Sequence, residues 1–358
     1  MHHKHPKIAR PAIGRYARTE FALVGSTCAR MEQLMREWMR ELSGSYRCLT
    51  VTGEHQEPEV PAAARYGRKA FASDHLSWTN FDDRLLGGGY DLALVNGNHY
   101  PAARQIVFID AEKAGTLERR REQLTDVVAV IHVNGDLPDW LPEAPVLPLD
   151  RVGEVPALIA EALGEAVPPL RALILAGGRS QRMGEDKSRI VYRDGQTEVE
   201  RLAGLCVALG VPASVSVRSE QDGEGFSLPL VTDRFVGLGP AGAICSAFLS
   251  DPDAAWLVLA CDLPLLDEST LRRLIDARRP ERVATAVRGP EQEWPEPLVA
   301  IYEPRAYQRL LRFLSLGYAC PRKLLINSDT EVLTLREALP ITNANTPEER
   351  RRVQNMLG

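Results

Sequence analysis

Several features are scarce in this 358-residue chain, and each scarcity excludes a class of protein. The six cysteines include no Cys-x-x-Cys pair, which argues against a zinc site and against a disulfide framework. No apolar run has the length of a membrane span, and the first residues lack the apolar segment of a secretory signal. We therefore expect a cytoplasmic protein with no membrane partner.

Positive charge and histidine are also limited. The net charge is -5, and because nucleic-acid binding favours a basic chain, this balance argues against a nucleic-acid partner. All seven histidines lie at or before His132, so the second half of the chain has no imidazole to act as a general base. Chemistry in that half must therefore rest on other groups, such as a metal ion and fixed positive charge.

The length and composition predict two globular domains. A chain of 358 residues is long for one hydrophobic core, and 44% hydrophobic with 25% charged residues is ordinary for a globular protein. We place the domains at residues 1–166 and 170–358, separated where Pro168 and Pro169 end a helical pattern. In the first domain, predicted strands alternate with helices, among them one over residues 29–42 with an apolar face and one over residues 112–123, which predicts a parallel, doubly wound sheet. We expect the second domain to be a doubly wound α/β domain as well.

The most informative stretch is residues 173–187, which read LILAGGRSQRMGEDK. Four apolar residues predict a buried strand that opens into a glycine-rich loop. Because Gly177 and Gly178 have no Cβ atom, backbone N–H groups there can approach the phosphates of a nucleotide. Arg182 and Lys187 add the positive charge that a triphosphate requires. The structural alternative is a glycine-rich turn with a solvated basic edge.

An aspartate follows the apolar strand predicted at residues 255–260. A carboxylate at the carboxyl end of a buried parallel strand lies in the crevice where doubly wound sheets bind ligands. Magnesium prefers one or two carboxylates with phosphate oxygens and water, so Asp262 is the candidate metal ligand. Capping of the next helix is the alternative, although Asp267 or Ser269 is better placed for that role.

A second aspartate follows the strand predicted at residues 228–231. The carboxylate of Asp233 is able to accept two hydrogen bonds from guanine, and ribose hydroxyls suit it equally well. It precedes a glycine-rich turn that includes Gly239, at the start of a predicted helix. We assign Asp233 to nucleotide binding, with capping of the turn as the structural alternative.

The glycine-rich stretch matches neither a P-loop nor a dinucleotide-binding fingerprint. It resembles the LAGGxSxRMGxDK signature of nucleotidyltransferases, in the form found in the molybdenum cofactor guanylyltransferase family. The resemblance extends over essentially the whole second domain. It implies a Rossmann-like fold and transfer of GMP from GTP to molybdopterin, with release of pyrophosphate and with Mg²⁺ as cofactor.

The same resemblance implies roles for individual residues. Lys187 and Arg182 would bind the triphosphate and, with Asp262, form the catalytic group. The nucleotide-binding backbone that it implies begins at the end of the strand, at Leu175, Ala176, Gly177 and Gly178. It also implies that the turn at Gly239 contributes to the nucleotide pocket.

Two later segments fit this family as well. Residues 296–302, EPLVAIY, resemble the strand where the pterin side of its cleft begins. The basic segment Pro321, Arg322 and Lys323 would pair with the molybdopterin phosphate, although a solvated face explains its two charges equally well. Residues 342–349, TNANTPEE, match its C-terminal motif, which implies that Asn343 and Asn345 lie near the active site. Part of this motif also has the spacing of a capping box.

The first domain resembles the small P-loop GTP-binding adaptor of molybdopterin-guanine dinucleotide biosynthesis. The resemblance lies in residues 90–97, YDLALVNG, and in the elements that follow. Where that family has its P-loop, residues 25–31 read GSTCARM, without the second glycine and the lysine, and Asn96 replaces an acidic residue. We expect a degenerate domain that docks a partner or a pterin without hydrolysing nucleotide. An unrelated α/β domain is the alternative.

Other functions stay open at this point. The loop would also suit a molybdopterin cytidylyltransferase or a sugar-1-phosphate nucleotidyltransferase, and the whole chain could be a noncatalytic cofactor carrier or scaffold. The expected partners are GTP and molybdopterin or the molybdenum cofactor, together with the cofactor insertion machinery or molybdoenzymes.

Overall fold

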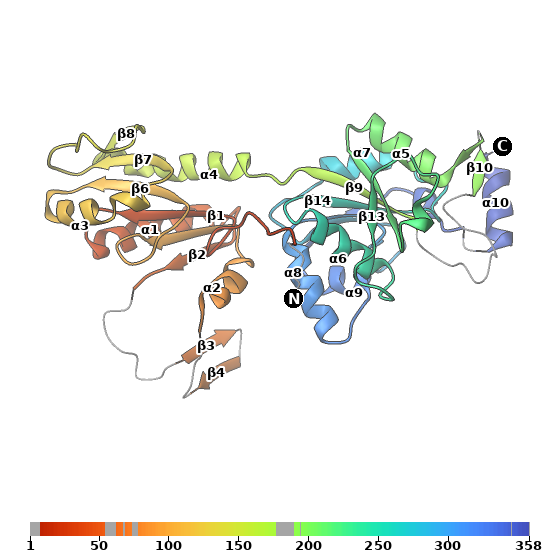
Figure 1. Cartoon of the computed structure of the whole chain (residues 1–358), viewed down its shortest axis with the longest axis horizontal. Coiled ribbons are helices and arrows are strands. Elements are labelled where there is room, and N and C mark those ends of the chain that lie inside the picture. The colour runs from red at the N-terminus through yellow and green to blue at the C-terminus, as the bar shows by residue number, and fades with distance from the viewer. Residues whose placement is uncertain are drawn as a thin grey trace, which may run out of the picture. The chain divides into compact units, whose positions relative to one another are not determined.

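The computed structural model describes residues 8–53, 62–66, 69–73, 78–176, 190–193, 195–344 and 346–357. The chain forms two compact units, residues 12–167 and residues 168–358, with the N-terminal residues up to Pro11 assigned to the second unit. Figure 1 shows that each unit is a β-sheet with helices packed against it. Within the described residues, no helix has the length and apolar character needed to cross a membrane.

The first unit is built on a parallel six-stranded sheet of order β2–β5–β1–β6–β7–β8, as the alternation of strands and helices predicts. Helix α1 (Cys28–Leu42) packs its predicted apolar face into the core, and Met31, Met35 and Trp38 are buried. A second helix, α4 (Val155–Glu165), packs beside it. The strands are β1 (Thr19–Val24), β2 (Cys48–Val51), β5 (Leu92–Asn96), β6 (Arg104–Ile109), β7 (Val127–His132) and β8 (Val146–Pro148).

Several elements of the first unit differ from the prediction. Residues 112–123, predicted as one helix, contain α3 (Ala114–Arg119) between two short 3₁₀ turns. The hairpin of β3 (Ala62–Tyr66) and β4 (Lys69–Ser73) was not predicted, nor was α2 (Asn80–Gly87). Their sequences are short and carry little hydrophobic periodicity, which is the signal that sequence reading depends on.

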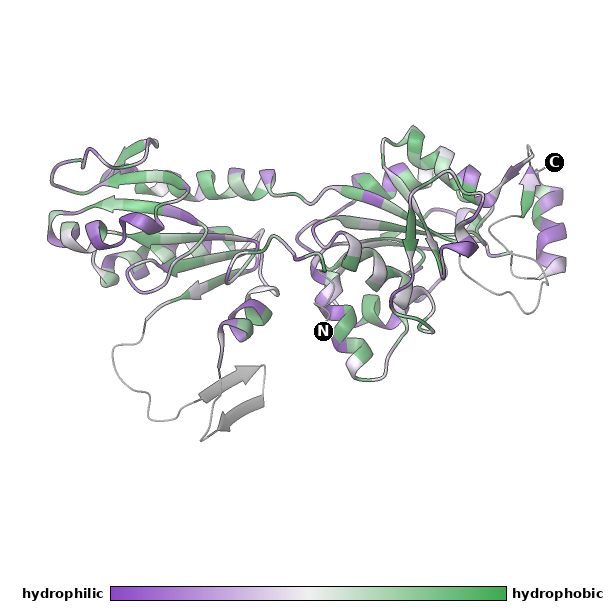
Figure 2. Ribbon diagram, in the orientation of Figure 1, coloured by the Kyte–Doolittle hydropathy of each residue, from purple (hydrophilic) through white to green (hydrophobic). Residues whose placement is uncertain are grey.

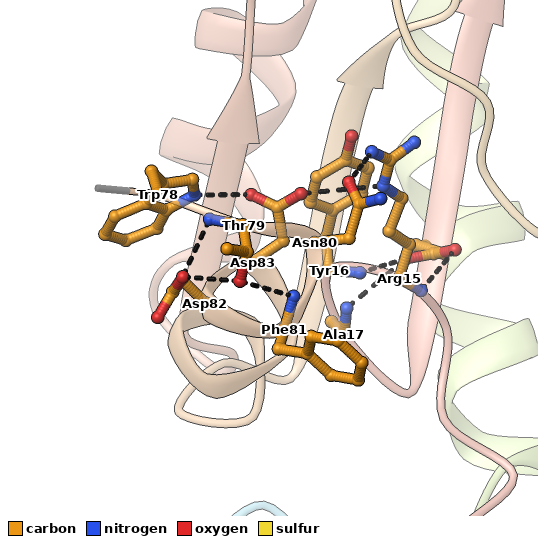
Figure 3. A network of polar contacts seen from close by, with 10 residues as sticks. Arg15, Tyr16, Ala17, Trp78, Thr79, Asn80, Phe81, Asp82 and Asp83 are labelled. Carbon is orange, nitrogen blue, oxygen red and sulfur yellow. Dashed lines mark hydrogen bonds and ion pairs between the residues drawn. The ribbon is translucent and has the colours of Figure 1, made fainter. Parts of the chain in front are cut away.

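Helix α2 is held by a polar network around its first turn (Figure 3). Thr79 and Asp82 form a capping box: the Thr79 side chain accepts a hydrogen bond from the Asp82 backbone N–H, and the Asp82 side chain accepts one from the Thr79 backbone N–H. The Trp78 indole donates to Asp83 Oδ1 at 2.9 Å, and Arg15 Nε lies 3.5 Å from Asp83 Oδ2. The network therefore ties the start of α2 to the segment before β1.

The second unit contains a seven-stranded sheet of order β13–β12–β9–β14–β16–β15–β17. Its first four strands are parallel, as expected of a doubly wound domain, and so is the β15–β17 pair, whereas β16 is antiparallel to both of its neighbours. Only a short loop joins β15 to β16, and without a crossover helix the chain returns antiparallel. The strands are β9 (Leu170–Leu175), β12 (Ala213–Val217), β13 (Leu230–Thr232), β14 (Ala255–Ala260), β15 (Ala284–Arg288), β16 (Val299–Tyr302) and β17 (Thr330–Thr334).

Helices cover both faces of this sheet, and successive residues of a strand point to opposite faces. Ile174 of β9 packs on one face with α5 (Glu198–Ala208) and α7 (Glu268–Asp276). Leu173 packs on the other face with α6 (Pro240–Ser250), α8 (Arg305–Ser315) and α9 (Pro321–Ile326). Figure 2 shows the resulting contrast between the apolar strands and the largely hydrophilic helix α10 (Pro347–Leu357).

Candidate active site

The parallel strands of the second unit bring their carboxyl ends to one edge of the sheet. Leu175 at the end of β9 is paired with Ser216 of β12 on one side and with Ala260 of β14 on the other. The chain passes from β9 to β12 and β13, then crosses back to β14, so β9 is the switch point of the sheet. Ligands of doubly wound sheets bind in the crevice at such a point.

The glycine-rich loop starts at this edge. Leu175 and Ala176, the two predicted backbone contacts that the structure describes, lie where β9 ends, and Ala176 N–H donates to the carbonyl of Ser216 at 3.2 Å. The chain is described again from Ile190, which is buried ahead of β10 (Val191–Arg193) and β11 (Gln196–Thr197). Five of the predicted site residues lie outside the described residues, namely Gly177, Gly178, Arg182, Lys187 and Asn345.

Asp262 lies at the same edge, two residues beyond β14, and its side chain is half-buried. Its backbone carbonyl accepts a hydrogen bond from Ala344 N–H at 2.9 Å, which places the exposed Asn343 beside it. Asp267 caps α7 by accepting a bond from Thr270 N–H at 2.7 Å, as the sequence predicts. Asp262 is therefore not needed as a helix cap.

Glu296 brings a second carboxylate close to Asp262. Strand β16 is antiparallel to β14, so the residues just before β16 lie at the edge where β14 ends. Burial raises the pKa of the Glu296 carboxyl, and the negative charge of Asp262 raises it further. The Leu298 N–H and Arg322 act in the opposite direction and lower this pKa. Arg322 Nη2 lies 3.2 Å from Glu296 Oε2. Sequence reasoning named Glu296 only as the first residue of a strand motif.

Tyr192 is another neighbour that sequence reasoning missed. Burial, with a contribution from the negative charges of Glu198 and Asp262, raises the pKa of its hydroxyl to about 12. The Arg350 guanidinium lies 5.8 Å from the centre of its ring, so the helix of the TNANTPEE motif packs on β10. Thr346 and Glu349 form the predicted capping box of that helix, with hydrogen bonds of 3.0 and 3.2 Å.

Asp233 combines a position at the edge with a structural role. Its Oδ1 accepts hydrogen bonds from Phe235 N–H at 2.9 Å and from the Ser246 hydroxyl at 3.0 Å. The capping alternative considered for this residue is therefore present in the structure. Gly239 follows, as the residue before α6, with φ of 58° and ψ of -142°, a conformation that favours glycine.

The donor set around Asp262 fits a magnesium ion. Carboxylate oxygens are the ligands that Mg²⁺ prefers, and it commonly takes only one or two of them together with substrate phosphates and water. In the part of the chain that the structure describes, no group of three or more His, Cys, Asp and Glu side chains could hold a metal. A site with Asp262 as its protein ligand therefore needs a nucleotide to complete it.

At the corresponding edge of the first unit, polar side chains bond to one another. The Ser26 hydroxyl donates to Asp110 Oδ2 at 2.6 Å, and the Arg30 guanidinium pairs with the same carboxylate. Asn96, which stands where the resembled adaptor has an acidic residue, donates to Glu32 at 3.1 Å. The Arg30 guanidinium at the start of α1 is therefore already paired with a buried carboxylate.

Comparison with known proteins identifies the second unit. A sequence profile of the MobA-like NTP transferase domain matches residues 172–331. A probable molybdenum cofactor guanylyltransferase from Opitutus terrae is 31% identical over 193 residues, which are 51% of this chain and 94% of that protein. The chain belongs to the MobA-like NTP transferase family.

This nucleotidyltransferase has further relatives. The molybdenum cofactor biosynthesis bifunctional protein of Synechocystis sp. is 34% identical over 184 residues, which are 51% of this chain and 52% of that protein. The chain thus spans about half the length of that relative. A solved structure, molybdopterin-guanine dinucleotide biosynthesis protein A from Archaeoglobus fulgidus, is 20% identical with a TM-score of 0.45, over 52% of this chain and 98% of that one.

Proposed function

We propose that this nucleotidyltransferase transfers GMP from GTP to molybdopterin, releasing pyrophosphate and forming the guanine dinucleotide form of the cofactor. The observation that carries the proposal is the position of Asp262. Asp262 lies at the carboxyl end of β14, beside the end of β9 where the glycine-rich loop begins. Its backbone carbonyl accepts a hydrogen bond from the N–H of Ala344 in the TNAN segment. Relatives named molybdenum cofactor guanylyltransferase support this choice of nucleotide and acceptor.

The chain's own groups would hold the nucleotide in this reaction. Lys187 and Arg182 bind the triphosphate, and their charge stabilises the transition state as the molybdopterin phosphate attacks the α-phosphorus and pyrophosphate leaves. Asp233 and Asn343 contact the nucleoside part from the two sides of β9. Asp262 would hold Mg²⁺, which supplies Lewis-acid stabilisation of the phosphate oxygens.

Arg322 is the proposed contact for the phosphate of molybdopterin. Its guanidinium is held by Glu296 Oε2 at 3.2 Å and by the carbonyl of Pro295 at 3.3 Å, and its side chain is 47% exposed. The buried carboxylate thus orients the guanidinium, which carries further N–H donors for a phosphate. For the first unit we propose docking of a partner or a pterin, without GTP hydrolysis.

The test is pyrophosphate release by the purified full-length chain with molybdopterin and Mg²⁺, run separately with GTP and CTP. We expect pyrophosphate release with GTP and none with CTP. The rate of release should fall by about 10²–10³-fold in Asp262→Asn if that carboxylate supports the transition state. The control is Asp253→Asn, in the turn before β14 and away from the carboxyl edge. Release with CTP alone would identify a cytidylyltransferase, and no release with either nucleotide would favour a carrier or a sugar-phosphate enzyme.

A further inference from the structure

A buried ion pair lies beneath the turn that follows Asp262. Glu198 and Arg201, one helical turn apart at the start of α5, are 1% and 8% exposed. Arg201 Nε lies 3.0 Å from Glu198 Oε1 and Nη2 lies 2.8 Å from Oε2, so the pairing is two-pronged. The sequence does not indicate that these two residues are buried, because their spacing is typical of an ion pair on a solvated helix face.

The same guanidinium also binds the turn that carries Asp262. Arg201 Nη1 donates to the carbonyl of Leu266 at 2.7 Å, and Nη2 donates to the carbonyl of Leu263 at 3.1 Å. The turn is closed on itself by a hydrogen bond from Leu266 N–H to the Leu263 carbonyl at 3.0 Å. Arg201 therefore holds both ends of a turn that begins one residue after Asp262.

Stability alone does not account for this arrangement. Burying two opposite charges costs desolvation energy, and apolar residues of similar size often make a protein equally or more stable. An apolar side chain would, however, leave the carbonyls of Leu263 and Leu266 without the donors that Arg201 provides. The planar guanidinium is rigid and has five N–H groups, so it binds the carboxylate and both carbonyls in one fixed geometry.

Two further bonds extend the arrangement to the exit of the glycine-rich loop. Arg193 Nη2 donates to the carbonyl of Pro264, inside the same turn, at 3.3 Å. Glu198 N–H donates to the carbonyl of Ile190 at 3.0 Å, which is the first described residue after the loop. These bonds connect Ile190 and Arg193, which follow the loop, with the start of α5 and with the turn after Asp262.

We propose that Arg201, held by Glu198, is a positioning residue that fixes the Asp262 carboxylate at the carboxyl end of β14. The proposal rests on the proposed function, in which Asp262 holds the metal and the loop holds the triphosphate. Arg201 touches neither substrate nor metal in this scheme. Loss of such outer-shell support typically lowers metal affinity or activity by about 10–100-fold.

The test uses the full-length chain and two variants. The double variant Glu198→Gln/Arg201→Met removes the pair without leaving an unpaired buried carboxylate, and Arg201→Lys keeps the charge but loses the planar fork. The control is Arg272→Met, which removes a solvated ion pair with Glu268 on α7. Three properties are measured: Mn²⁺ affinity in the presence of GTP, hydrogen exchange at the Ala344 and Leu266 amides, and the kcat and KM of transfer.

We expect both variants to be folded, with Mn²⁺ affinity and kcat lower by about 10-fold or more and the KM for GTP nearly unchanged. Exchange should be faster at Ala344 N–H, which bonds to the Asp262 carbonyl, and at Leu266 N–H, while Arg272→Met matches the wild type. Wild-type affinity and exchange in a folded Arg201→Lys would overturn the proposal. If the wild type transfers no GMP, the Mn²⁺ and exchange measurements still decide it, so its failure and that of the proposed function are distinguishable.

Discussion

Replacing Arg278 by methionine tests how strongly the second unit depends on a second buried ion pair. Arg278 follows α7 and pairs with Glu303, with Nε to Oε1 at 2.7 Å and Nη2 to Oε2 at 2.9 Å. Glu303 is 0% exposed, and Arg278 Nη2 also donates to the carbonyl of Pro168 at 2.8 Å. Methionine retains an apolar chain of similar length but leaves the Glu303 carboxylate without this guanidinium.

The expected loss of stability is large. Removing one partner of a buried ion pair costs about 3–5 kcal/mol, because the remaining charge is left in a medium that solvates it poorly. For a urea dependence of about 2 kcal/mol per molar, this corresponds to a midpoint lower by about 1.5–2.5 M. An exposed pair gives a different result: Arg272→Met, which removes the bond to Glu268, should cost less than about 1 kcal/mol.

The loss should also depend on pH. Burial raises the pKa of the Glu303 carboxyl, Arg278 and Arg305 oppose that rise, and Glu281 adds to it. Without Arg278 the folded-state pKa rises further above the unfolded value. A carboxyl of this kind stabilises the fold at low pH, and the contribution is lost as the pH rises through the folded pKa. The deficit of Arg278→Met should therefore be smaller at about pH 5 than at about pH 8.

The assay is equilibrium unfolding of the full-length chain in urea at both pH values, followed by tryptophan fluorescence. Trp256, which is 2% exposed in the core of the second unit, reports on the relevant transition. Equal losses in Arg278→Met and Arg272→Met, or a deficit that does not change with pH, would refute the reasoning.

Gly239→Ala should destabilise the chain by about 1–2 kcal/mol, because the φ of 58° at this position is unfavourable for alanine. Gly204→Ala, on the exposed side of α5, should stabilise the chain by about 0.5–1 kcal/mol, because alanine is the better helix former. Urea unfolding of the two variants tests this, and shifts of the same sign would contradict it. Lys187→Ala should lower GMP transfer by about 10²–10³-fold at unchanged thermal stability; near-normal turnover would remove Lys187 from the mechanism. With GTP and Mg²⁺ but no acceptor, the full-length chain should release no inorganic phosphate, because Arg30 pairs with Asp110 in the first unit. Steady release that persists in Lys187→Ala would contradict this expectation.

Local patterns predicted many of the strands and helices of both units, and the site residues that they named stay predictions. Apolar runs located β9 and β14, and the glycines after the first run and Asp262 after the second marked where the chain leaves the sheet. The cap at Asp267 and the capping box at Thr346 and Glu349 were also predicted correctly, because capping depends on residues only a few positions apart.

The neighbours of Asp262 could not be predicted in this way. Glu296 lies nearby because β16 is inserted antiparallel between β14 and β15, and strand order is decided by packing over long separations in the chain. Arg201 has the spacing of a solvated helical residue, and its burial follows from how α5 packs beside the 263–266 turn.

The sequence by itself determined the signature of the family, the strand ends and the carboxylates that belong to them, since these follow from short-range periodicity and residue chemistry. Only the tertiary structure decided which carboxylates are neighbours, which arginine holds the turn after Asp262, and that Asp233 also supports its own turn. The physical reason is that hydrogen-bonding partners of a buried group are chosen by the packed fold, where an unpartnered polar atom is costly and residues far apart in sequence become adjacent.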